Sequence, residues 1–179
     1  RADVGEDVKI LDQEARSSLR KHGIRFGQFT VFMPLLLKPA PTRLRLLLWS
    51  LATGLQEFPE APPPGLVTVP TDEKAPLGYH LKSGYRAAGE RALRVDMAER
   101  LADMLRTQNT RGGFEATADM LSITGMTLEQ FANLMQGLGY RSERAERVKV
   151  KPVLVVDTVA NEEAVSAAEI ATENKLLAV

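Results

Sequence analysis

The sequence has no cysteine and only two histidines, His22 and His80. The lack of thiols excludes disulfides and thiolate metal sites, and two imidazoles so far apart in the sequence argue against a zinc site. The longest apolar run, residues 30–37, is short and contains Pro34, so it cannot span a bilayer. Since no basic and apolar pattern marks a secretory signal, we expect a piece of a larger, cytoplasmic protein.

Nucleotide-binding and catalytic motifs are lacking as well. The chain has no GxxxxGK[ST] phosphate loop, no GxGxxG and no acidic metal-holding box. No serine or threonine has the surroundings of an activated nucleophile, and neither histidine has a carboxylate nearby in sequence. Asp96 and Glu99 could be offered as paired carboxylates, but their spacing is typical of a capping box at a helix start. We therefore expect no catalytic residue, cofactor or metal in this chain.

Acidic residues are absent from one long window, although the whole chain is formally neutral. Residues 15–56 contain no Asp or Glu but seven basic side chains: Arg16, Arg20, Lys21, Arg25, Lys38, Arg43 and Arg45. Such a segregation of charge can attract a polyanion, for example the nucleic-acid backbone. Alternatively, these charges simply solvate a helix and a strand edge. With 44% hydrophobic and 26% charged residues, the chain as a whole has the composition of an ordinary globular protein.

The first part of the chain has local patterns of both helix and strand. Apolar spacing predicts a helix over residues 8–21, capped by Asp12 and stopped at Gly23. Alternation over residues 24–31 then predicts a strand, kinked at Gly27.

Prolines 34, 39 and 41 forbid a regular element between them, so we expect the next helix to begin at Pro41 or Thr42 and to end at Gly54. Its buried face is predicted to be Leu44, Leu47, Leu48 and Leu51, with Arg43 and Arg45 on the other side.

Six of the ten prolines fall within residues 57–77, which predicts a linker or a long ordered loop and marks the domain boundary. Beyond it, residues 91–95 could form one of a pair of short strands that turn at Gly89. A helix then follows from Asp96 to about Arg106.

The stretch from Phe114 to Arg141 predicts two short helices joined at Gly125. Thr127 can cap the second helix while Gln130 reaches back, which is a capping box. A long helix, two short helices and an extended chain are the order of a winged-helix domain, although a simple helical hairpin looks the same in sequence. The fold class we predict is mainly α with a few short strands (α+β), a helical N-terminal part preceding a winged-helix-like C-terminal part.

Charge and composition divide the chain into four regions. They are a basic accessory region (1–56), the proline-rich linker (57–77), the winged-helix-like domain (78–151) and an acidic tail that could be helical (152–179). We predict two hydrophobic cores. The first contains Phe26, Phe29, Leu36, Leu44, Leu48 and Trp49; the second contains Leu101, Leu105, Leu121, Phe131, Leu134 and Leu138.

Three blocks carry a resemblance to a known family. They are EDVKILDQEARSSLRKHGIRFGQFTVFMPLLLKPAPTRLRLLLW (6–49), GERALRVDMAERLADML (89–105) and SITGMTLEQFANLMQGLGYR (122–141). Together they resemble the C-terminal region of bacterial superfamily 2 helicases related to the mitochondrial degradosome RNA helicase. The resemblance covers residues 6–141 and implies an accessory region of an ATP-dependent RNA helicase. The motor domains that bind ATP and Mg²⁺ would then lie outside this sequence.

Two functions follow from these observations. In the first, the chain contacts the backbone of single-stranded RNA through basic side chains, the candidates being Lys38, Arg43, Arg45, Arg141, Arg144 and Arg147. In the second, it is a protein-interaction module that docks the helicase onto a ribonuclease or another partner. A shared face for the basic residues favours RNA, whereas scattered basic residues beside an open apolar patch favour a protein partner. A stand-alone enzyme of unrecognised chemistry is a further alternative with the least support, because nothing in the chain has catalytic spacing.

Overall fold

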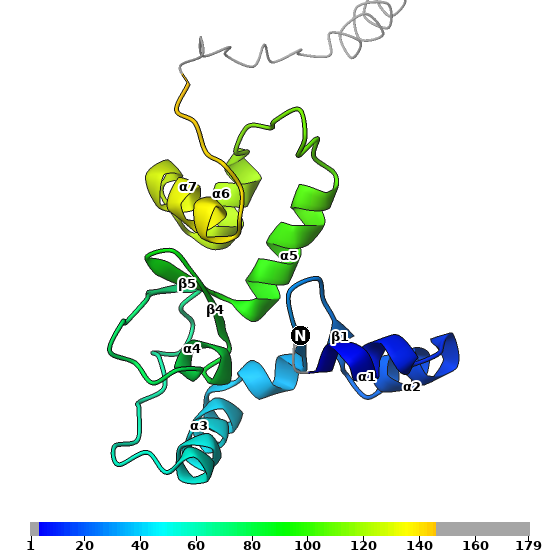
Figure 1. Ribbon diagram of the computed structural model, residues 1–179, viewed down its shortest axis with the longest axis vertical. Coiled ribbons are helices and arrows are strands. Elements are labelled where there is room, and N and C mark those ends of the chain that lie inside the picture. The colour runs from blue at the N-terminus through cyan, green and yellow to red at the C-terminus, as the bar shows by residue number, and fades with distance from the viewer. Residues whose placement is uncertain (1–3, 146–179) are drawn as a thin grey trace, which may run out of the picture. The chain divides into compact units, whose positions relative to one another are not determined.

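The computed structural model describes residues 4–145, which form an α+β fold (Figure 1). The described residues contain seven α-helices, one short 3-10 helix and two small antiparallel sheets. The helical content and the few short strands confirm the predicted α+β class. Residues 1–143 form one compact unit, and a second unit begins at Arg144. The predicted acidic tail and Arg147 lie outside the described residues.

The N-terminal helix is divided in two. Helices α1 (Gly5–Ile10) and α2 (Gln13–Lys21) are separated where Leu11 adopts an extended backbone. Asp12 caps α2 as predicted, because its Oδ1 accepts a hydrogen bond from the Ala15 N–H at 2.7 Å. The chain leaves α2 through Gly23, whose φ of 86° lies in the left-handed region that glycine adopts without strain.

The predicted single strand over residues 24–31 is wrong, because the chain reverses within it. Strands β1 (Arg25–Phe26) and β2 (Val31–Phe32) pair as an antiparallel hairpin. Both arms show the same alternation of side chains, so the pattern alone could not reveal the turn between them. The fold of that turn depends instead on a residue of a distant helix.

That residue is Glu99, which lies in helix α5 (Val95–Arg106) and is buried. Its carboxylate accepts hydrogen bonds from three consecutive backbone N–H groups of the hairpin turn: those of Gln28, Phe29 and Thr30. The predicted capping box of Asp96 and Glu99 is therefore wrong. Glu99 binds the turn rather than the start of its own helix. Bonds to a carboxylate are among the stronger hydrogen bonds in proteins, so this contact holds the hairpin against α5.

The tip of the hairpin packs onto the second half of the chain. The ring of Phe29 lies under the Arg86 guanidinium, whose Cζ is 4.6 Å from the ring centroid, a cation–π distance. Phe29 also packs against the main hydrophobic core. A Cβ at Gly27 would collide with the Glu99 carboxylate, so the close approach of the turn to α5 requires glycine there.

Helix α3 (Pro39–Thr53) follows the 3-10 helix η2 (Pro34–Leu37) and ends at Gly54, as predicted. It begins at Pro39, two or three residues earlier than expected, because proline is tolerated in the first turn of a helix. Its buried side chains are Thr42, Leu46 and Ser50, so the predicted buried face is also wrong. The predicted first core fails with it, since Leu36, Leu44 and Leu48 are exposed.

The proline-rich segment is attached to the rest of the unit. Within it, β3 (Thr68–Pro70) pairs with β5 (Arg91–Arg94). The hydroxyl of Tyr79 donates to the Glu60 carbonyl at 2.7 Å, and that of Tyr85 donates to the Leu66 carbonyl at 2.8 Å. The segment is therefore an ordered loop with a short strand.

The larger sheet has the strand order β3-β5-β4, where β4 is Tyr85–Ala88. The short helix α4 (Tyr79–Lys82) precedes β4 and contacts both it and α3. The predicted pair of strands turning at Gly89 is confirmed by β4 and β5.

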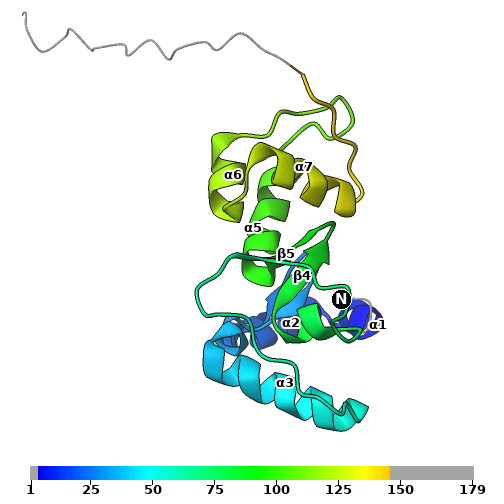
Figure 2. The same ribbon diagram turned by 90° about the vertical axis from the view of Figure 1, so that its left-hand side faces the viewer.

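Helices α5 and α7 (Leu128–Gly137) contact this sheet at one end, and α6 (Ala118–Thr124) packs against these two helices (Figure 2). The capping box of Thr127 and Gln130 is present as predicted. The second predicted core is confirmed: Leu101, Leu105, Phe131 and Leu134 are buried, and Leu121 and Leu138 pack against them. The strands precede these three helices, and residues 138–145 contain no strand.

Candidate interaction surface

The first candidate residues lie at the start of α3. Lys38 is the residue before the helix and Arg43 is in its first half, and both side chains are exposed. Among residues 4–145, neither forms an ion pair with a carboxylate. Two solvated cations therefore lie close together in sequence at the N-terminus of α3, where the helix dipole adds partial positive charge.

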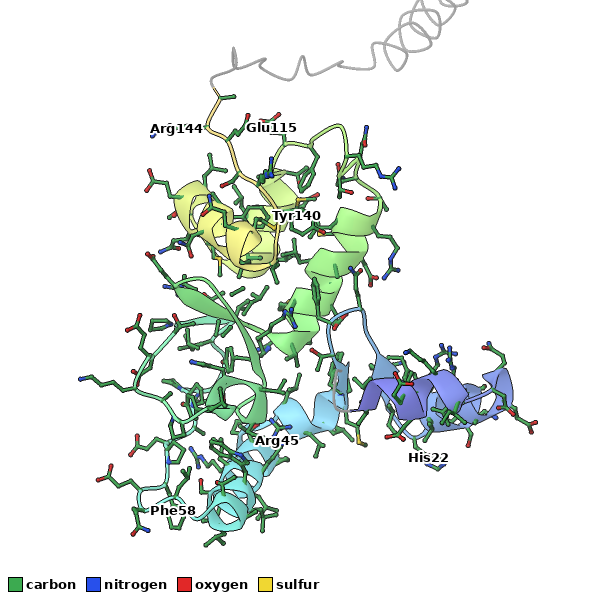
Figure 3. The ribbon with its side chains drawn as sticks, viewed as in Figure 1. His22, Arg45, Phe58, Glu115, Tyr140 and Arg144 are labelled. Atoms are coloured by element: carbon green, nitrogen blue, oxygen red, sulfur yellow. The ribbon has the colours of Figure 1, made fainter. Side chains whose placement is uncertain are left out.

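Arg45 has a different environment, although it lies two residues further on. Its side chain is half-buried, and its Nε donates a hydrogen bond to the Lys82 carbonyl at 2.6 Å, which connects α3 to α4 (Figure 3). Burial lowers the pKa of the Arg45 guanidinium from its ordinary value. Arg45 thus stabilises helix packing and is a poor candidate for a phosphate contact.

The remaining candidates are not on α3. Arg141 is exposed and follows α7, whereas α3 contacts α4 and η2. Figures 1 and 2 show α3 and α7 on opposite sides of the β4–β5 hairpin. Arg144 is exposed in the second unit, and Arg147 lies outside the described residues. Within the first unit, Lys38 and Arg43 are both at the start of α3, whereas Arg141 follows α7.

A stripe of leucines is exposed along α3, which sequence reasoning assigned to the core. Its members are spaced as i, i+3, i+4 and i+7, and we call them the leucine face: Leu44 (56% exposed), Leu47 (42%), Leu48 (57%) and Leu51 (60%). In η2, Leu35 and Leu36 are exposed as well. Contiguous apolar surface of this kind marks an interaction site more often than isolated exposed leucines do.

The opposite side of α3 explains why the leucines face outwards. Leu46 is 2% exposed, and Ser50 is fully buried beside it, with its hydroxyl donating to the Leu46 carbonyl at 2.8 Å. Thr42 is also buried, and its hydroxyl donates to the Leu36 carbonyl at 3.1 Å. Small side chains that satisfy their own hydrogen bonds let α3 approach its neighbours closely. Sequence hydrophobicity ranks leucine above serine and threonine, so it selected the wrong face.

A groove lies beside the leucine face. It is open to solvent and is lined by Arg43, Leu46, Leu47, Phe58, Pro59, Glu60 and Ala61. Phe58, which is exposed, lies near the C-terminal half of α3 in Figure 3. The groove thus combines apolar side chains of α3 and of the proline-rich segment with one cation, Arg43, and one carboxylate, Glu60.

Other kinds of site are not found in the part of the chain that the structure describes. Residues 4–145 contain no cluster of three or more His, Asp or Glu side chains placed to hold a metal ion. None of the helices between these residues is both long enough and apolar enough to cross a membrane. Comparisons of the chain with family models, with curated proteins and with solved structures gave no match.

Proposed function

We propose that this chain is an accessory region of an ATP-dependent RNA helicase that docks onto a partner protein through the leucine face of α3. The helicase assignment rests on the sequence resemblance over residues 6–141. The docking role rests on one observation: four leucines at helical spacing are 42–60% exposed on a helix whose opposite side is packed. Burying such a stripe would contribute about 25 cal/mol per Å² of apolar surface.

The distribution of the basic residues supports docking over RNA binding as the main role. The candidate phosphate contacts do not gather on one face, because Arg45 is bonded to Lys82 and Arg141 follows a different helix. Scattered cations beside an open apolar stripe are the arrangement that favours a protein partner. A ribonuclease is the partner that the resemblance implies.

A photo-crosslinking amino acid placed in the full-length parent protein tests this role. We expect a crosslinker at Leu48 to capture one protein reproducibly in cells, and a crosslinker at Leu128 to capture none. Leu128 is the matched control, because it is 60% exposed on a helix outside the leucine face. Equal capture from both positions would contradict docking through α3.

RNA contact is the second candidate, and a specific observation supports it. Lys38 and Arg43 are exposed without carboxylate partners, inside a window of 42 residues that has no acidic side chain. They could hold backbone phosphates of a single strand without reading bases. A winged-helix-like arrangement, predicted for residues 78–151, belongs to this candidate, and within the described residues the order of α5, α6 and α7 supports it.

A further inference from the structure

The leucine face has a charged end and an uncharged end. This difference along α3 indicates how charge should be distributed along a segment that binds there. All cations of α3 lie in its first half, at Arg43 and Arg45, with Lys38 immediately before the helix. The second half, from Leu46 to Thr53, has no charged residue. No Asp or Glu occurs in residues 15–56, and Glu60, which lines the groove together with Arg43, forms no ion pair with it in the described structure.

A helix with its own apolar stripe matches this surface in shape. Side chains at i, i+3, i+4 and i+7 form a ridge that packs against the stripe of another helix. The groove between α3 and Phe58 gives such a ridge a place to enter. Helix-in-groove recognition of this kind uses a few apolar anchors on one face of the bound segment.

The charge of that helix follows from the cations at the start of α3. Basic side chains of a partner helix placed next to Lys38 and Arg43 would be repelled by these cations, and the positive end of the α3 dipole would add to the repulsion. Carboxylates there would pair with two cations that have no ion-pair partner within residues 4–145. Beyond Leu46, α3 itself has no charge, and the groove beside it contributes one carboxylate, that of Glu60, which an acidic residue of the partner would avoid.

From this complementarity we infer that the leucine face binds an amphipathic helix of a partner protein, with Asp or Glu clustered at one end of its apolar stripe. The inference rests on the docking role proposed above and specifies the chemistry of the partner. Apolar burial supplies the affinity, and the acidic end selects the partner and its direction along α3.

Two synthetic peptides of about five helical turns separate these contributions. Both carry leucines at i, i+3, i+4 and i+7. One has three glutamates at one end and the other has three lysines at the same positions. In titrations of the full chain, we expect the glutamate peptide to bind about tenfold more tightly at low salt, and the difference to shrink in high salt.

Variants of the chain show which side chains supply the apolar contribution to peptide binding and which supply the charge contribution. Leu44→Ser with Leu48→Ser should weaken binding of both peptides about tenfold or more, whereas Lys38→Ala with Arg43→Ala should weaken only the glutamate peptide. The control pair, Leu77→Ser with Leu128→Ser, changes leucines that are exposed elsewhere and should have no effect.

The possible outcomes distinguish the two proposals. If both peptides bind equally and the leucine variant abolishes binding, docking stands and the acidic partner is overturned. If neither peptide binds the unmodified chain or the tail variant described below, or if the leucine variant binds as the unmodified chain does, both proposals fail. A concentration-dependent dimer that is lost in the leucine variant would assign the face to a second copy of the chain. Binding that emerges only when Glu162, Glu163, Glu169 and Glu173 are changed to Gln would assign it to the chain's own tail.

Discussion

Glu99 connects two parts of the chain that sequence patterns treat separately. Its carboxylate accepts hydrogen bonds from three consecutive backbone N–H groups of the hairpin turn, and the residue is 9% exposed. Groups of this kind lose their hydrogen bonds together when the acceptor is removed, and each unsatisfied buried donor is costly. Glu99 is thus a structural residue, although a glutamate in a helix usually indicates a solvated surface.

Replacing Glu99 with Ala should lower the free energy of unfolding by about 3 kcal/mol, because three partly buried donors lose a charged acceptor. Glu99→Gln should cost less, since the amide oxygen still accepts. Urea denaturation measures both changes. Asp103→Asn is the control, since it alters an exposed ion pair with Arg106 and should stay within about 0.5 kcal/mol. A similar small change for Glu99→Ala would contradict the role given to this residue.

Gly27 and Glu99 should be energetically coupled. Alanine at residue 27 places its Cβ against the Glu99 carboxylate, so Gly27→Ala should destabilise the unmodified chain. In the Glu99→Ala background the obstruction is gone, and the same change should cost at least about 1 kcal/mol less. A double-mutant cycle of unfolding free energies measures this coupling. Simple additivity would show that the turn does not touch α5 in solution.

Phe131 tests the larger core. It is 3% exposed and belongs to the cluster of α5, α6 and α7. Phe131→Ala should lower the free energy of unfolding by about 3 kcal/mol or more, through lost burial and the cavity left behind. Leu128→Ala, on the exposed side of the same helix, serves as the comparison in the same denaturation series. A loss at Phe131 no larger than at Leu128 would mean that α7 faces the other way.

At the level of elements, local signals predicted helix ends better than helix faces. Thr127 with Gln130 and the glycines at 54 and 125 each specify a terminus by chemistry that lies within a few residues. The buried side of α3 depends on its neighbours in space, which make room for Thr42 and Ser50. The hairpin turn likewise depends on a carboxylate about 70 residues away, and no local pattern contains that information.

The orientation of α3 predicts that truncating Leu46 and truncating Leu48 lower the free energy of unfolding by very different amounts. Leu46→Ala should lower the free energy of unfolding by about 2–4 kcal/mol, because Leu46 is 2% exposed. Leu48→Ala should change it by less than about 1 kcal/mol, since that side chain is 57% exposed and alanine is a good helix former. Thermal or urea unfolding of the two variants measures both changes in the free energy of unfolding. Equal losses of unfolding free energy would show that Leu48 is buried and that the leucine face is part of a core.

For the whole molecule, sequence reasoning predicted the fold class and the second core, but it placed the candidate site imperfectly. The basic window over residues 15–56 is a property of the sequence, and two of its cations, Lys38 and Arg43, are exposed in the structure. It could not separate them from Arg45, because the bond of Arg45 to the Lys82 carbonyl depends on the packing of α4 against α3.

RNA binding across a salt series tests the second candidate function on the intact chain. If Lys38 and Arg43 each hold a phosphate, their double replacement by Ala should flatten the slope of log K against log salt by about 0.7 for each contact, for every RNA sequence alike. Folding should be unaffected, since both side chains are exposed. Arg45→Ala should instead destabilise the chain. No binding at low salt, or an unchanged slope, would remove the RNA candidate and leave docking.

The carboxylate bound to the hairpin turn also constrains when the N-terminal part can become ordered during synthesis. Residues 25–32 leave the ribosome well before Glu99, which lies about 70 residues further along the chain. Until α5 has emerged and formed, the Glu99 carboxylate is not in place to accept hydrogen bonds from the N–H groups at the turn. Contacts so distant in sequence close a long loop and form late. The nascent hairpin should therefore remain open to proteases and chaperones until the second half of the chain has been translated.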